Sequence, residues 1–261
     1  AETLYLHPYF WDKTSERTRG GFPFLFPICG RLERDGKMGA YLYDARLYTM
    51  PIHGFAMRMP WAVLNHTADR LTLGLRDTET TRRVYPFSFV LTLEFRIAPD
   101  AFAIGVRCEN TGKGVLPYYA GFHPFFLTPM PGAGKEAVLL DFRPLRCLAY
   151  NERLTDLAGE RALPACPLPV TDPAINETLT VVGAENETRL TYPDGKTLRI
   201  RAEGDEDPDL FAYLQFYTMP DRPFFCVEPW MAFPNALNAV AGARRLPPGA
   251  FESGTLTVRS A

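Results

Sequence analysis

The sequence predicts an all-β protein, an antiparallel β-sandwich, because apolar residues alternate, turn signals are frequent and helical periodicity is scarce. The clearest strand is Phe89–Ile97, where the odd positions are apolar and most even ones are not. This alternation is typical of a strand with one buried face. The pattern returns over 102–108, and Pro99-Asp100 between the two segments favours a tight reversal of the chain.

Several shorter segments are also predicted to be strands, and turn residues separate them. The strand candidates are 71–75, 198–200, 211–216 and 255–258. Turns are predicted where Gly, Pro, Asn and Asp gather, at 34–36, 110–112 and 192–195. Residues 236–243 contain good helix formers, but the segment is too short and too interrupted by glycine to predict a helix. The proline-rich stretch 157–173 is predicted to be a loop within one domain.

The composition is that of an ordinary globular protein. The chain has 261 residues, of which 46% are hydrophobic and 22% are charged, which is enough to fill a sizeable core. All-β sandwiches and barrels of this size often form one unit. We therefore expect a single domain over residues 1–261, without internal repeats.

Charge and hydropathy argue against several function classes. The formal net charge is −2, so the chain lacks the basic excess that nucleic-acid binding requires. No apolar run approaches the roughly 18 residues of a membrane helix. Residues 1–10 also lack the basic-then-apolar order of a signal peptide. The sequence therefore predicts no nucleic acid and no membrane as partner, and favours a small neutral or weakly charged ligand.

The five cysteines are widely spaced and form no CxxC pair. Neither a zinc ribbon nor a thioredoxin-type site is therefore predicted. Their neighbours are apolar or small, which is typical of buried free thiols in a reducing compartment. The cysteine pattern thus favours a cytoplasmic protein.

Three short segments place one titratable side chain each among aromatic or apolar residues. They are 51–56 with His53, 118–126 with His123, and 224–230 with Glu228. Aromatic walls suit the apolar faces of a sugar ring, while a few polar groups hold its hydroxyls. Glu228 and His123 could supply the base and the acid of a reaction that removes one proton from the substrate and adds another to it. A lone His-Pro or Glu-Pro dipeptide is usually structural, so the spacing alone does not establish a site.

Six segments resemble, in the same order, those of one known family, the aldose 1-epimerases or galactose mutarotase-like proteins. The resemblance runs from Phe22 to the end of the chain, and six segments in the family's order are far more specific than any one motif. The segments are 24–32 (FLFPICGRL), 48–56 (YTMPIHGFA), 121–126 (GFHPFF), 214–218 (LQFYT), 225–230 (FCVEPW) and 246–249 (LPPG).

The resemblance implies a large antiparallel β-sandwich of galactose mutarotase type, with the sugar in an open cleft on one sheet. It implies that Glu228 takes the proton of the anomeric hydroxyl while His123 protonates the ring oxygen, which opens the ring. His53 would donate to the sugar and stabilise developing charge, and Arg31 and Gln215 would bind hydroxyls. The reaction requires no cofactor and no metal, because the substrate itself holds the alcohol and the carbonyl it generates.

Two departures from the family's pattern affect the sugar-binding residues. Many relatives read HGFAR, whereas here Arg58 comes one place late, and one step along a strand reverses the facing of a side chain. Arg58 remains a candidate substrate-binding residue, and whether it reaches the ligand depends on a bulge that restores its facing. In one branch of the superfamily, arginines near this point bind the phosphate of a hexose 6-phosphate. The shifted position of Arg58 weakens the case for that substrate, while Arg19 and Arg58 together keep the case open. The family's sugar-binding aspartate is replaced by Glu177, and Asp209 is a rival for the same role.

Two other classes of function remain compatible with the sequence. Two histidines and a carboxylate could form a facial triad for iron or zinc, although such sites often have two ligands close in sequence. A non-catalytic sugar-binding protein could also use the same fold, since fold does not fix function. The identity of the sugar, the oligomeric state and the completeness of the N-terminus are left open by the sequence.

Overall fold

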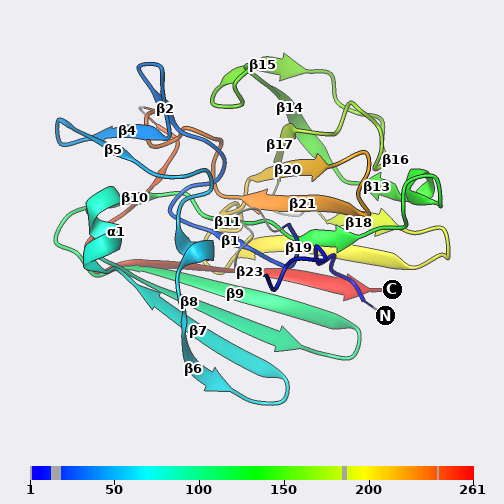
Figure 1. Ribbon diagram of the computed structural model, residues 1–261, viewed down its shortest axis with the longest axis horizontal. Coiled ribbons are helices and arrows are strands. Elements are labelled where there is room, and N and C mark those ends of the chain that lie inside the picture. The colour runs from blue at the N-terminus through cyan, green and yellow to red at the C-terminus, as the bar shows by residue number, and fades with distance from the viewer. Residues whose placement is uncertain (1, 13–18, 184–186, 240) are drawn as a thin grey trace.

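Two large antiparallel sheets pack around one extensive hydrophobic core (Figure 1). The computed structural model describes residues 2–12, 19–183, 187–239 and 241–261. The first sheet runs, in spatial order, β1 (Phe24–Leu25), β11 (Gly121–Phe122), β21 (Phe224–Trp230), β20 (Tyr213–Thr218), β17 (Thr178–Val182), β14 (Pro144–Tyr150) and β15 (Leu157–Arg161), and β12 (Phe125–Leu127) also pairs with β21.

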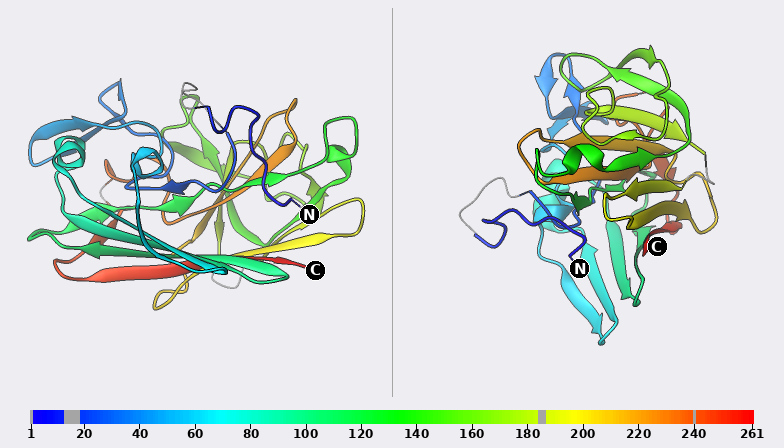
Figure 2. Two further views of the ribbon diagram at one scale, coloured as in Figure 1. Left: turned by 60° about the horizontal axis from the view of Figure 1, so that its bottom comes forward. Right: turned by 90° about the vertical axis from the view of Figure 1, so that its right-hand side faces the viewer.

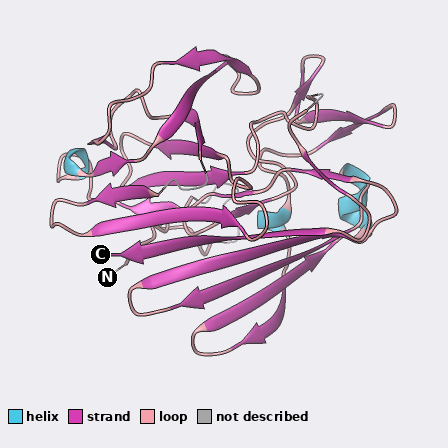
Figure 3. Cartoon of the chain, turned by 180° about the vertical axis from the view of Figure 1, so that it is seen from behind, coloured by secondary structure: helices cyan, strands magenta, loops and turns pink. Residues whose placement is uncertain are grey.

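The second sheet contains the longest strands, which fan out below the first in Figure 1 and face the viewer in Figure 3. Its spatial order is β16 (Leu168–Pro169), β13 (Leu139–Asp141), β18 (Thr188–Thr191), β19 (Thr197–Gly204), β23 (Phe251–Ser260), β9 (Ala101–Asn110), β8 (Phe89–Ile97), β7 (Arg70–Arg76) and β6 (Ala62–His66). The antiparallel β-sandwich predicted from the sequence is confirmed.

The small hairpins of residues 33–49 and one short helix lie at one end of the sandwich, as the left view of Figure 2 shows. The paired short strands are β2 (Glu33–Arg34) with β3 (Lys37–Met38), β4 (Ala40–Tyr43) with β5 (Arg46–Thr49), and β10 (Leu116–Tyr118) with β22 (Arg244–Leu246). The helices are α1 (Glu79–Val84) and the 3-10 turns η1 (Ala56–Arg58) and η2 (Lys135–Ala137). None of the helices among the described residues has the length and apolar character needed to span a membrane.

The strand with the clearest apolar alternation is present in the structure, whereas the segment with the weakest alternation was predicted wrongly in part. Phe89–Ile97 is β8, and it pairs along its whole length with β9 through the reversal at 98–100. The candidate at 211–216 begins two residues later, at Tyr213. The prediction of a loop over 157–173 is wrong in part, because β15 and β16 lie within it. Four of the five β15 residues are exposed at the sheet edge, so this strand carries no apolar alternation for a sequence to reveal.

Strand β21 is buried at all seven of its positions, which places it at the centre of the first sheet. It pairs with β20 in a register that sets Gln215 opposite Glu228 and Tyr217 opposite Cys226. Residues directly opposite in an antiparallel pair share one face of the sheet. The turn between β20 and β21 therefore fixes which polar side chains meet on that face.

Lys135 is a fully buried lysine whose ammonium group binds atoms of this turn. Its ammonium donates to the hydroxyl of Thr218 at 2.8 Å, to the carbonyl of Met219 at 2.8 Å and to the carbonyl of Arg222 at 2.6 Å. Three acceptors match the three donors of an ammonium group. The buried charge is therefore fully hydrogen-bonded within the turn.

The Lys135→Met variant is expected to lose about 2–4 kcal/mol of unfolding free energy, because it removes the three hydrogen bonds that the ammonium group donates within the turn. Urea denaturation of the variant and the wild type measures this loss. The exposed Lys113 provides the matched control, and Lys113→Met is expected to change the midpoint little. Equal midpoints for K135M and wild type would show that the ammonium does not stabilise the turn.

Candidate functional site

Glu228 is a buried carboxyl group in the middle of β21, with only 1% of its surface exposed. Burial raises its pKa well above the usual range, the negative charge of Glu177 adds to this effect, and the indole N–H of Trp230 opposes it. Its Oε2 atom has no hydrogen-bond partner among the described residues. A carboxyl group so placed holds its proton to higher pH than an exposed carboxyl group does.

His123 lies in the two-residue break between β11 and β12, with its ring against Glu228. Its Nε2 is 3.4 Å from Glu228 Oε1, and its side chain is 13% exposed. The ring stacks on Phe125 with centroids 4.6 Å apart and planes 6° from parallel, while its backbone N–H donates to Pro23. Burial first, and then the neighbouring His53, lowers the pKa of His123 well below its usual range. Aromatic stacking and the strand break together aim the imidazole at the carboxyl group.

His53 sits in a turn rather than a strand, with a left-handed backbone φ of 63°. Its backbone N–H donates to the Gly30 carbonyl at 2.9 Å, and the Gly30 N–H donates back to His53 Nδ1 at 3.1 Å. Because Nδ1 accepts a hydrogen bond, the neutral ring carries its proton on Nε2. Burial, followed by the charges of Arg58 and Arg31, lowers the pKa of His53 to about 3. His53 is therefore a neutral hydrogen-bond donor.

Gly54 explains why a glycine follows this histidine. Its φ is 70°, and a Cβ atom there would lie 2.2 Å from the carbonyl oxygen of Phe26. No side chain fits in that space. The close approach ties the His53 turn to the segment after β1, which carries Gly30 and Arg31.

A cleft of about 430 Å³ opens over the first sheet and collects every side chain predicted to act on the sugar. Those residues are Arg31, His53, Arg58, His123, Glu177, Gln215 and Glu228. Its wall is completed by residues for which no role was predicted, among them Phe125, Tyr150, Tyr217 and Trp230. A larger groove of about 1180 Å³ lies beside the N-terminal segment, and none of the seven predicted residues lines it.

Arg58, which the alternation of a strand would turn away from the ligand, lies at the cleft. Residues 56–58 form the 3-10 turn η1 instead of a strand, so the alternation of facing does not apply. Arg58 lines the cleft, and so does Arg19.

Of the two acidic candidates for sugar binding, Glu177 lines the cleft and Asp209 does not. Asp209 is exposed in the loop before β20, where its backbone N–H bonds to Asp207. Glu177 has a left-handed φ of 50° just before β17. Burial raises its pKa, and the charge of Arg31 opposes the rise.

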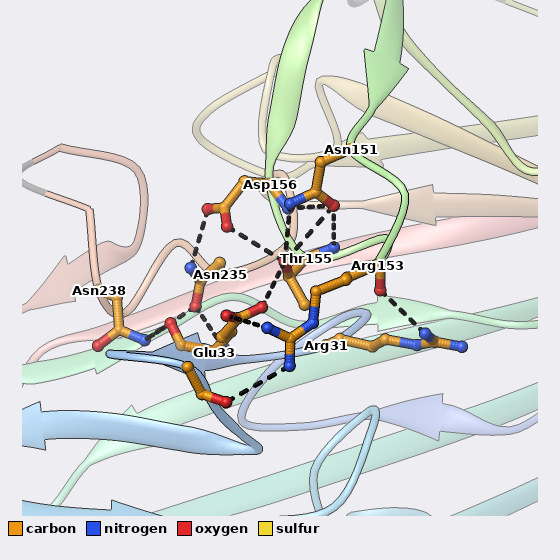
Figure 4. Close-up of polar contacts among 9 residues, drawn as sticks. Arg31, Glu33, Asn151, Arg153, Thr155, Asp156, Asn235 and Asn238 are labelled. Atoms are coloured by element: carbon orange, nitrogen blue, oxygen red, sulfur yellow. Dashed lines mark hydrogen bonds and ion pairs between the residues drawn. The ribbon is translucent and has the colours of Figure 1, made fainter.

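Arg31 is anchored by the loop between β14 and β15 (Figure 4). Its guanidinium donates to the Arg153 carbonyl at 2.9 Å, and Arg153 in turn forms an ion pair of 2.6 Å with Glu33. Glu33 also accepts from the Thr155 hydroxyl at 3.1 Å. Figure 4 shows these side chains meeting between the β2 hairpin and the loop. The network holds Arg31 at the cleft wall by contacts that the sequence does not reveal.

Tyr150 is a cleft residue that sequence reasoning missed. Its hydroxyl donates to Gln215 Oε1 at 2.7 Å, and Gln215 Nε2 donates to the Phe216 carbonyl at 3.0 Å. The Gln215 side chain is thus held by two partners before any sugar binds. Tyr150 ends β14, whose apolar alternation is weak, so no pattern singles it out.

Comparison with known proteins gives one family over nearly the whole chain. Residues 7–257 match the family model described as Aldose 1-epimerase. The chain belongs to the aldose 1-epimerase family. "Protein LacX, plasmid" of Lactococcus lactis subsp. lactis is 23% identical over 247 residues, covering 88% of this chain and 80% of that protein.

Solved structures share the fold of this aldose 1-epimerase family member. The Slr1438 protein of Synechocystis sp. PCC 6803 aligns with a TM-score of 0.83 at 24% identity, over 99% of this chain and 84% of the other. A galactose mutarotase-like protein of Lactobacillus casei ATCC 334 aligns with a TM-score of 0.78 at 21% identity, over 100% of this chain and 90% of the other.

His53 is expected to hold its proton on Nε2 and to remain neutral at any pH well above about 3. Long-range proton–nitrogen NMR of the imidazole rings distinguishes the two tautomers and follows their titration. Arg58→Met should raise the pKa of His53, because it removes a positive charge that disfavours the imidazolium. Arg34→Met is the matched control, because Arg34 lies in β2 and does not line the cleft. A proton on Nδ1, or an imidazolium at mildly acidic pH, would contradict the assignment.

Proposed function

We propose that this protein is an aldose 1-epimerase that interconverts the α and β anomers of an aldose by opening and reclosing the ring. The observation that carries the proposal is the contact of 3.4 Å between His123 Nε2 and Glu228 Oε1 on the floor of the cleft. The anomeric oxygen and the ring oxygen of a sugar are bonded to the same carbon. An acid and a base that serve both oxygens must therefore be close neighbours, as these two are.

Ring opening moves two protons and breaks one bond. Glu228 takes the proton of the anomeric hydroxyl while His123 gives a proton to the ring oxygen, and the bond from the anomeric carbon to the ring oxygen breaks. The open chain then holds an aldehyde and a new hydroxyl. After rotation about the neighbouring carbon–carbon bond, the new hydroxyl attacks the aldehyde carbon and gives its proton to His123. Glu228 returns its proton to the aldehyde oxygen, and the other anomer forms.

The step starts with Glu228 as a carboxylate and His123 as an imidazolium. Burial disfavours each charge alone, which is why the pKa of Glu228 is raised and that of His123 is lowered. Their contact lets one charge offset the other. The neutral His53 donor adds a hydrogen bond to charge that develops on the sugar, while Arg31, Arg58, Glu177 and Gln215 hold its hydroxyls.

Glu228→Gln is expected to lower kcat by more than about 100-fold, because the amide cannot accept the hydroxyl proton. Polarimetry of freshly dissolved α-glucose and α-galactose measures the rate, after subtraction of the rate in buffer. Glu152→Gln, which changes an exposed glutamate, is the matched control and should keep the wild-type rate. A loss below tenfold in E228Q would remove Glu228 from the role of base. A wild type that never exceeds buffer would favour a non-catalytic sugar-binding protein.

The pH profile of kcat/KM should respond to Glu177, because its charge raises the pKa of Glu228. Glu177→Gln removes that charge, so the pKa of Glu228 falls and the acid limb of the profile moves to lower pH. The overall rate is also expected to fall, since Glu177 lines the cleft, but the position of the limb is independent of its height. The E152Q variant should leave the limb where it is. An unmoved limb in E177Q would mean that Glu228 is not the group that the profile reports.

A phosphorylated hexose is a second candidate substrate, favoured by three arginines on the cleft wall, Arg19, Arg31 and Arg58. Guanidinium groups bind phosphate oxygens in a paired geometry. A Salmonella typhimurium protein named "Putative glucose-6-phosphate 1-epimerase" is 32% identical over 129 residues, covering 48% of this chain and 38% of that protein. A higher kcat/KM for glucose 6-phosphate than for glucose, lost in Arg58→Met, would select this substrate class.

A further inference from the structure

Cys226 lies on the same face of β21 as Glu228, two residues away, and the proposed sugar chemistry does not use it. It is fully buried, and its neighbours across the sheet are Tyr217 on β20 and Phe125 on β12. The ring of His123 stacks on Phe125. The thiol is therefore surrounded by the residues that position the acid and the base.

Three ligand atoms meet at this point: one nitrogen of His123, the sulfur of Cys226 and one carboxylate oxygen of Glu228. They lie within 4.8 Å of one another, and among the described residues no other trio of histidine, cysteine or acidic side chains does so. A tetrahedral zinc site has bonds of about 2.0–2.3 Å, so its ligand atoms lie roughly 3–4 Å apart. The contact of 3.4 Å between His123 and Glu228 already has this length.

His123 and Glu228 also each have one buried atom, outside their 3.4 Å contact, that lacks a hydrogen-bond partner. His123 Nδ1 and Glu228 Oε2 have no hydrogen bond among the described residues. Buried polar atoms without partners are uncommon and often mark the place of a ligand or an ion. Both side chains line the cleft, so a cation that enters there reaches them first and the thiol beneath them next.

We propose that His123, Cys226 and Glu228 bind a thiophilic divalent cation, Zn²⁺ or Cd²⁺, and that the bound cation inhibits the enzyme. The thiol loses its proton to solvent, and the thiolate and the carboxylate together balance the two positive charges of the cation. A neutral cluster is the form that a buried site tolerates best. The fourth coordination position faces the cleft. Mg²⁺ and Ca²⁺ prefer sites made of oxygen ligands, so this donor set discriminates against them.

The cation acts as an inhibitor because it occupies the lone pairs that carry the protons of the proposed reaction. This second half rests on the proposed function, whereas binding itself does not. His53 remains outside the trio, and its Nδ1 already accepts the Gly30 N–H. The donor set is thus distinct from one made of two histidines and a carboxylate.

Cd²⁺ titration of the full chain tests binding, because a cadmium thiolate has a charge-transfer band in the ultraviolet. We expect the band of the wild type to saturate at one Cd²⁺ per chain. Cys226→Ser should lose the band and weaken binding by at least about tenfold. Cys29→Ser is the matched control, because Cys29 is equally buried and also feels the charge of Glu228 but lies outside the trio.

The titration distinguishes loss of metal coordination by Cys226 from a general disturbance of core packing. A band that survives in C226S, or that is lost equally in C29S, overturns the site. If C226S fails to show the cooperative melting of the wild type, Cys226→Ala replaces it, since alanine suits the apolar cluster that Cys226 shares with Tyr5, Phe125 and Phe224.

Polarimetry in the presence of Zn²⁺ tests inhibition. The wild type should be inhibited, a chelator should reverse the effect, and Mg²⁺ should have none. Each variant is compared with its own uninhibited rate, and C226S should need at least about tenfold more Zn²⁺ than wild type or C29S. Equal sensitivity of C226S and wild type contradicts inhibition through the trio. A Cys226-dependent cadmium band without any epimerase activity would uphold the cation site and reject the proposed function.

Discussion

The site is organised around one group whose burial is energetically unfavourable, the carboxyl of Glu228 inside a fully buried strand. Water cannot solvate it there, so its charged form depends on the few groups within reach. His123 offers a countercharge at 3.4 Å, and Glu177 opposes ionisation from the cleft wall. The proton affinity of Glu228 is therefore set by its neighbours. Moving β21 by one residue would turn the carboxyl to the other face of the sheet and end the arrangement.

The surrounding fold holds these neighbours by hydrogen bonds rather than by side-chain packing alone. His53 is fixed by a reciprocal pair of hydrogen bonds with Gly30, and this pair also decides which ring nitrogen carries the proton. Arg31 and Gln215 are held by Arg153 and Tyr150. A site whose donors are fixed before the sugar arrives loses little free energy to reorganisation during the reaction. The same tight grouping creates the soft-metal donor set with Cys226.

Much of the fold can be predicted from short-range patterns, because buried and less buried residues alternate along β8 and β9. The exposed edge strand β15 and the six-residue helix α1 carry no such pattern, and the sequence misses them. The catalytic candidates came from motif resemblance, which assigns positions but not orientation. Arg58 shows the limit, since its facing depends on the turn η1, whose first residue, Ala56, donates to the carbonyl of the distant Phe26. Tyr150 shows another, because its partner Gln215 is distant in sequence.

A crystal structure of the Glu228→Gln variant with a bound aldose tests the central claim most directly, because the slowed reaction holds the sugar in place. The account predicts the anomeric oxygen within about 3 Å of the residue 228 side chain and the ring oxygen at hydrogen-bond distance from His123 Nε2. A sugar bound in the cleft with its anomeric carbon turned away from both residues would contradict it.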